Sequence, residues 1–228
     1  MASPAPGGLI IAIDGVVSSG KSATARGVAA ALGYRHIDTG AMYRALTLAA
    51  MKRGVSADDK AGLGLLLLEA QVELEPASSG GRVFLDGTDV SDEIRRPEVS
   101  QAVGAYADVT EVRQALVVRQ RAMGDSGGVV ADGRDVGSVI FPHADLKVRM
   151  TADLDERARR RHRELKKKGL CLTLNMVKSD IQERDRQDAE RTYGGQADLI
   201  NTLEFDTTGL TLQDQIDRIV LWARERGA

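Results

Sequence analysis

The sequence predicts an α/β fold in which helices cover both faces of a mostly parallel sheet. Short apolar runs alternate with longer segments of helical periodicity along most of the 228 residues. The first apolar run, Leu9–Ile13, leads into a glycine-rich string that ends in Gly-Lys-Ser. A chain of this length can bury one main core with room for small insertions. We therefore expect one α/β domain with its ligand site beside that first strand.

Five apolar runs predict the strands: Leu9–Ile13, Tyr34–Ile37, Gly128–Asp132, Leu146–Met150 and Thr202–Phe205. Six segments with apolar residues at helical spacing predict the main helices: Lys21–Leu32, Ala41–Lys52, Val109–Met123, Leu154–Lys167, Met176–Thr192 and Leu212–Arg226. A strand followed by a helix and another strand favours parallel pairing.

One segment interrupts this alternation. Apolar and polar residues alternate over 72–75 and again over 82–85, on either side of turn-forming residues, which predicts a small antiparallel hairpin. Thr88–Val90 is a candidate third strand. The leucine run Leu63–Leu68 is too short to span a membrane, and we expect it to be the buried face of a helix against this insertion.

Composition limits the class of protein. The chain has 31 basic and 33 acidic residues, a net charge of −2, and one cysteine, Cys171. This balance argues against a protein that binds nucleic acid or a membrane over its whole surface, so anion binding must be local. A single cysteine excludes an internal disulfide and fits a reducing compartment. We expect a cytoplasmic monomer.

The glycine-rich string fits the phosphate-binding pattern GxxxxGK[ST]. Its glycines let backbone N–H groups approach phosphate oxygens, Lys21 supplies a charge for the β- and γ-phosphates, and Ser22 supplies a hydroxyl for Mg²⁺. A chance match is the alternative, but the flanking strand and helix argue against it. The predicted nucleotide-binding residues are Gly15, Val16, Val17, Ser18, Ser19, Gly20, Lys21, Ser22 and Ala23.

Two further segments follow predicted strands in the same way, Asp38–Arg44 and Asp132–Asp135. Their polar groups are expected at the carboxyl end of the sheet, where open α/β folds bind ligands. Asp132 is a candidate to orient hydrated Mg²⁺. The simpler alternative for each segment is a turn capped by aspartate.

Charged residues also cluster on two predicted helices. Arg184, Asp188 and Arg191 share one face at i, i+4 and i+7, which suits either a surface ladder of ion pairs or the recognition of phosphate and ribose. The helix alone does not decide between these. The run 157–163, rich in arginine, favours a lid that closes over donor phosphates, although an exposed helix balanced by acidic residues is the alternative.

Taken together, four segments resemble the bacterial cytidylate (CMP/dCMP) kinases, which are P-loop nucleoside monophosphate kinases. They are Gly15–Ser22, Asp38–Arg44, Asp132–Gly137 with Phe141-Pro142, and Glu183–Asp185 with Asp188. The match runs in order over nearly the whole chain. It includes Asp86-Gly87 and Glu93–Arg95 in the insertion.

This resemblance implies a P-loop NTPase three-layer core with a central parallel sheet, a small antiparallel-sheet insertion and a helical lid. The core would comprise residues 1–38, 98–154 and 170–228. The insertion that binds the acceptor nucleotide would comprise 39–97, and the lid 155–169. The implied reaction is ATP + (d)CMP = ADP + (d)CDP, with Mg²⁺ as cofactor.

The resemblance also implies roles for single residues. Thr39, Arg113 and Asp135 would read cytosine, while Arg184 and Asp188 would meet the sugar. Arg44, Arg134 and Arg191 would hold the acceptor phosphate, with Tyr43 also in the substrate site. Lys21, Arg134, Arg157 and Arg161 would be catalytic.

Three departures from the family pattern stand out. Val16-Val17 replaces proline and a small residue, Gly104 replaces a serine near the sugar, and Gln187 stands where an arginine can occur. Substrate preference between CMP and dCMP therefore stays open.

Two other functions remain open at this point. A kinase of another small molecule would ordinarily need a base for a hydroxyl acceptor, whereas an acceptor phosphate is already ionised near neutral pH. A nucleotide-dependent switch protein would be expected to carry a guanine-reading motif such as N-K-x-D, which the sequence lacks.

Overall fold

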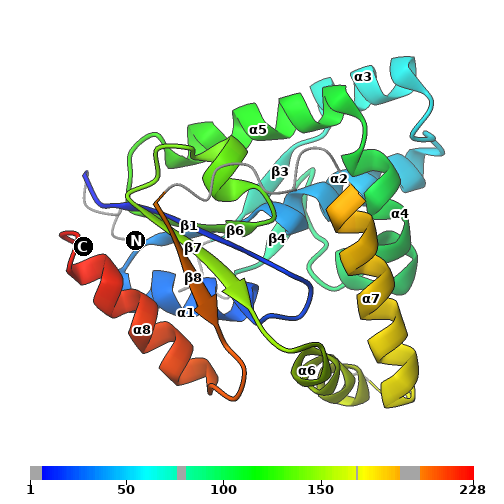
Figure 1. The fold of residues 1–228 in the computed structure, drawn as a ribbon. Coiled ribbons are helices and arrows are strands. Elements are labelled where there is room, and N and C mark those ends of the chain that lie inside the picture. The colour runs from blue at the N-terminus through cyan, green and yellow to red at the C-terminus, as the bar shows by residue number, and fades with distance from the viewer. Residues whose placement is uncertain (1–6, 76–80, 168, 191–200) are drawn as a thin grey trace.

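The computed structural model describes residues 7–75, 81–167, 169–190 and 201–228. Its central sheet has five parallel strands in the order β2-β6-β1-β7-β8 (Figure 1). Each lies within two residues of a predicted strand. Their bounds are β1 Ile10–Gly15, β2 Arg35–Asp38, β6 Val129–Gly133, β7 Leu146–Thr151 and β8 Thr202–Asp206.

Helices cover both faces of this sheet and make a three-layer core (Figure 1). Helices α1 (Lys21–Leu32) and α8 (Leu212–Arg224) lie on one face, and α2 (Thr39–Arg53) and α5 (Thr110–Gly124) on the other. Residues of β1 alternate between the two cores because successive side chains of a strand point to opposite faces. Ile11 and Ile13 pack with α1 and α8, whereas Ala12 belongs to the core beside α2.

The insertion contains the expected three-stranded antiparallel sheet, formed by β3 (Val72–Leu74), β4 (Val83–Leu85) and β5 (Thr88–Asp89). The helix expected around the leucine run is α3 (Lys60–Glu69). Only part of that run is buried, because Leu63 and Leu66 enter the core while Leu65 and Leu68 are 61% and 84% exposed. The prediction of one continuous buried face was therefore wrong for these two leucines.

Three short elements have no counterpart among the expected ones. Helix α4 (Pro97–Ala107) contains two polar residues and a glycine on the side that faces the ligand cavity. A 3₁₀ turn occupies Glu93–Arg95, and a π-helical turn occupies Val136–Ile140 after β6.

Helices α6 (Leu154–Lys167) and α7 (Leu174–Glu190) form a hairpin beside the carboxyl end of the sheet (Figure 1). They pack through Ala158, Leu165, Val177 and Ile181. Cys171, in the connection between them, is exposed. Across the described ranges, no helix combines the length and apolar character needed to cross a membrane.

Candidate active site

A cavity of about 530 Å³ lies at the carboxyl end of the sheet, where the loops after β1, β2 and β6 meet helices α4, α5 and α7. Most of the side chains predicted to bind substrate line it. They are Val17, Lys21, Ser22, Thr39, Tyr43, Arg44, Arg113, Arg134, Asp135, Arg184 and Asp188.

Other predicted residues lie outside the lining of this cavity. Arg157 and Arg161 belong to α6, and Arg191 falls outside the described residues. The remaining loop positions do not line the cavity either. They are Gly15, Val16, Ser18, Ser19, Gly20 and Ala23.

The loop between β1 and α1 is shaped by its backbone. Gly20 has φ +97° directly before α1, a conformation that L side chains rarely adopt. Gly15 lies so close to β7 that a Cβ there would be 2.4 Å from the Met150 carbonyl oxygen. The N-terminus of α1, with its positive dipole end, therefore borders the cavity at Lys21 and Ser22.

Lys21 contacts the backbone of its own loop. Its Nζ donates to the Val16 carbonyl oxygen at 3.4 Å. Burial and the neighbouring Arg134 charge lower the pKa of Lys21 to about 7. An anion in the cavity would favour the ammonium form, so the site is built to gain from binding negative charge.

Ser22 faces an acidic residue at the end of β6. Its hydroxyl donates to Asp132 Oδ2 at 2.5 Å, and His36 Nε2 lies 2.7 Å from Asp132 Oδ1. Burial opposes the charge on Asp132, but hydrogen bonds from His36 and Ser22 and the charge of Lys21 hold its pKa below the ordinary value. Asp132 is therefore an ionised carboxylate beside the loop.

The oxygen donors here fit Mg²⁺. Ser22 and Asp132 supply a hydroxyl and a carboxylate, and Mg²⁺ in kinase sites usually takes one or two protein oxygens together with phosphates and waters. Among the described residues, no group of three His, Cys, Asp or Glu side chains is placed to hold a metal by itself. A magnesium ion at this position would complete its ligands with nucleotide oxygens and waters.

Asp14 is a partly buried acid that is not among the predicted site residues. It accepts hydrogen bonds from the N–H groups of Val136 and Gly137, both at 2.8 Å, and so ties β1 to the π-helical turn. Burial raises its pKa to about 6 despite those bonds. The available signal was an acidic residue directly before the first glycine of the motif.

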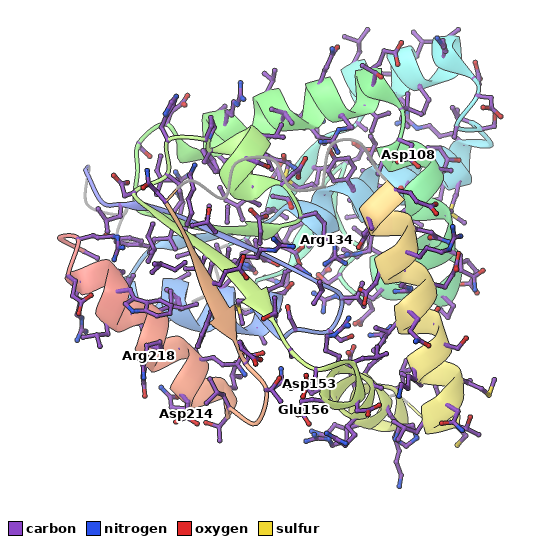
Figure 2. All side chains as sticks on the ribbon, in the orientation of Figure 1. Asp108, Arg134, Asp153, Glu156, Asp214 and Arg218 are labelled. Carbon is purple, nitrogen blue, oxygen red and sulfur yellow. The ribbon has the colours of Figure 1, made fainter. Side chains whose placement is uncertain are left out.

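Arg134, labelled in Figure 2, forms an ion pair with Asp188 of α7. Its Nε lies 2.9 Å from Asp188 Oδ2, and its guanidinium also donates to the Gly15 carbonyl. Arg44 lies 3.5 Å from Asp38, which in turn caps α2 by accepting from the Ala41 N–H at 2.7 Å. Two arginines are thus held toward the cavity by carboxylates at its edge.

The predicted base-reading residues lie together. Arg113 forms an ion pair with Asp135, and both are nearly buried. The Thr39 hydroxyl donates to the Asp132 carbonyl at 2.8 Å. Burial raises the pKa of Tyr43 to about 12, so its phenol stays neutral.

On α7, the face shared by Arg184 and Asp188 lines the cavity. Arg184 lies 3.4 Å from Asp180 one turn earlier. By contrast, Arg186 pairs with Glu183 and Glu190 on exposed surface. Helix α7 therefore has a ladder of surface ion pairs, and that ladder is formed by Arg186 with Glu183 and Glu190.

Arginines of α6 approach the glycine-rich loop. Arg157 is buried, donates to the Val17 carbonyl at 3.2 Å and lies 2.6 Å from Asp185. Arg160 donates to the Ser19 carbonyl at 3.0 Å and to the Thr207 carbonyl at 2.6 Å. Arg161 instead pairs with Glu164 at 2.8 Å. Arg160 therefore contacts the loop together with Arg157, whereas Arg161 pairs within α6.

Comparison with known proteins adds the decisive observation. A family model described as cytidylate kinase matches residues 11–225. The chain belongs to the cytidylate kinase family. It is therefore a phosphotransferase with a nucleotide-binding P-loop, and its family membership supports phosphorylation of a nucleoside monophosphate.

Individual relatives agree over nearly their whole length. The cytidylate kinase of Symbiobacterium thermophilum is 46% identical, with 95% of this chain and 96% of the relative covered. The cytidylate kinase of Geobacillus kaustophilus is 43% identical over 95% and 96% of the two chains. An uncharacterised protein from Eubacterium ventriosum, 12% identical, has a similar fold with a TM-score of 0.54 over 95% of this chain and 98% of its own.

Proposed function

We propose that this chain transfers the γ-phosphoryl group of ATP to CMP and dCMP, forming ADP and CDP or dCDP. One observation carries the proposal. A single cavity brings the P-loop side chains Lys21 and Ser22 together with Arg134 and the Arg113–Asp135 pair. Names of the relatives support the choice of a cytidine nucleotide as acceptor.

At the donor end, the P-loop backbone and Lys21 would bind the β- and γ-phosphates of ATP. Ser22 and Asp132 would hold Mg²⁺, which when bound would offset the charge of the phosphates. We assign the lid to residues 155–169, and Arg157 and Arg160 are the arginines of this segment that contact the P-loop backbone.

At the acceptor end, Arg44 and Arg134 would hold the phosphate of the monophosphate, because a guanidinium binds phosphate through paired N–H donors. Arg113 and Asp135 offer a donor and an acceptor, which suits the mixed hydrogen-bonding edge of cytosine. Gly104 lines the same cavity without a side-chain hydroxyl. This supports turnover of both CMP and dCMP.

The chemistry follows from charge and position. An oxygen of the acceptor phosphate is already ionised near neutral pH, so it can attack the γ-phosphorus in line without a strong base. Lys21 and Arg134 would stabilise the charge on the transferring group. The protein supplies alignment and positive charge to two anions that repel each other.

A coupled assay that detects diphosphate formation from ATP and a panel of nucleoside monophosphates tests the proposal. CMP and dCMP should both react, and UMP, AMP and GMP should react more slowly. If CMP and dCMP were inert while another monophosphate reacted, the proposed acceptor would be wrong. Cytoplasmic location is part of the proposal, supported by the single cysteine.

A further inference from the structure

His36 is a buried polar residue that the proposed chemistry does not use. It lies in β2 beside Val130 of β6, and Asp38 of β2 lies beside Asp132. Because side chains alternate along each strand, His36, Val130 and Asp132 share the face of the sheet that packs on α1. The strand register alone therefore brings the imidazole to Asp132.

The contact between His36 and Asp132 is direct and shielded from water. Their side chains are 6% and 2% exposed, and His36 Nε2 lies 2.7 Å from Asp132 Oδ1. The other carboxylate oxygen accepts the Ser22 hydroxyl. Asp132 is thus held by β2 through one oxygen and by α1 through the other.

An ionised carboxylate only accepts hydrogen bonds, so His36 must carry its proton on Nε2 to satisfy this contact. Burying an imidazole is costly unless it is hydrogen-bonded, and an apolar side chain would fill the same place more cheaply. A histidine at this position supplies an N–H donor that holds the Asp132 carboxylate in place.

We propose that His36 is a positioning residue, whose Nε2–H holds Asp132 in the orientation that presents its second oxygen to Ser22 and the magnesium of bound ATP. This inference rests on the proposed function, because it assigns the magnesium site to Ser22 and Asp132. Residues that orient groups at a metal site typically change metal affinity by about 10- to 100-fold when replaced.

Two substitutions separate hydrogen bonding from space filling. His36→Gln keeps an N–H donor at a similar reach, whereas His36→Leu fills the space without a donor. Calorimetry would measure ATP affinity with MgCl₂ and with EDTA for each protein. The factor by which magnesium raises ATP affinity should be smaller in His36→Leu than in the wild-type protein, by about tenfold or more. ATP affinity in EDTA should be unchanged. His36→Gln should restore most of the effect of magnesium.

His143→Leu is the matched control, because His143 is exposed and lies before β7, away from the carboxyl end of the sheet. It should leave both affinities at the wild-type value. The proposal would be overturned if magnesium raised the ATP affinity of His36→Leu as much as that of the wild-type protein. It would also be overturned if His36→Gln and His36→Leu lost this increase equally.

A second measurement needs no variant. The ¹⁵N shifts of the His36 ring in the wild-type protein should show a protonated Nε2, and an unprotonated Nε2 would overturn the proposal even if the variants did not fold. Failure of the proposed function has a different signature, since the wild-type protein itself would then form no CDP from CMP.

Discussion

Arg134 and Asp188 form an ion pair, with 2.9 Å between Nε and Oδ2, that joins the end of β6 to helix α7 across the cavity. The two residues are 54 positions apart in sequence and belong to different layers of the molecule. In the free protein the carboxylate offsets part of the arginine charge. Under the proposed function an acceptor phosphate would compete for the same guanidinium, and the pair would then couple acceptor binding to the position of α7.

Replacing Asp188 should therefore affect the acceptor more than the donor. We expect Asp188→Ala to raise KM for CMP and lower kcat, while the affinity for ATP changes little. Steady-state kinetics with each substrate varied in turn would measure this. Glu190→Ala on the same helix, where Glu190 pairs with Arg186 on exposed surface, is the control and should behave as wild type. Wild-type CMP kinetics in Asp188→Ala would show that Asp188 has no part in acceptor binding.

Replacing Lys21 should remove charge stabilisation of the transferring phosphoryl group. We expect Lys21→Ala to lower kcat by about 100- to 1,000-fold, the loss typical of one preorganised donor. Circular dichroism should show an unchanged fold, because the hydrogen bond from Lys21 to the Val16 carbonyl is long, at 3.4 Å. Lys52→Ala, which removes a half-exposed lysine paired with Glu93, is the control. A Lys21→Ala protein with near-normal turnover would disprove the assigned role.

If Lys21 binds ATP phosphates as proposed, its lowered pKa should link ATP binding to proton uptake. The pKa is about 7 in the free protein and 10.5 in the unfolded chain, so the folded protein binds fewer protons between these values. The contribution of Lys21 to the free energy of unfolding should therefore increase as the pH rises from about 7 to 10.5. Phosphates should raise the pKa again, so ATP binding at pH 8.5 should take up a proton.

Calorimetry in two buffers of different ionisation enthalpy would measure this uptake. At pH 8.5 ATP is fully ionised and Asp14, whose pKa is about 6, has lost its proton. Lys21→Met should abolish the uptake. Equal heats in both buffers for the wild-type protein would contradict the assignment.

Gly15 and Gly64 should respond oppositely to alanine. A Cβ at Gly15 would meet the Met150 carbonyl at 2.4 Å, so Gly15→Ala must displace β7 or the loop. We expect about 1–3 kcal/mol of lost unfolding free energy together with weaker ATP binding. Gly64 has open space around it in α3, and Gly64→Ala should gain about 0.5–1 kcal/mol. Urea unfolding measures both, and a neutral Gly15→Ala would contradict the close approach.

Much of the fold was predictable because its signals are local. Apolar runs predicted the strands. Helical periodicity predicted α1 and α6, and the structure confirms the bounds of both helices. Helix α4 was missed although it carries a local signal, the proline at its start. The exposed Leu65 and Leu68 show the opposite error, since an unbroken apolar run gives no indication of which leucines face water.

The sequence by itself determined the P-loop, the strand ends that carry aspartate and arginine, and the face shared by Arg184 and Asp188. These depend on residue type and on spacing within one element. Only the tertiary structure decided that Arg160 reaches the P-loop where Arg161 does not, and that His36 holds Asp132. Such contacts join residues about 100 positions apart or more, and the strand register and helix packing that create them leave no local pattern in the chain.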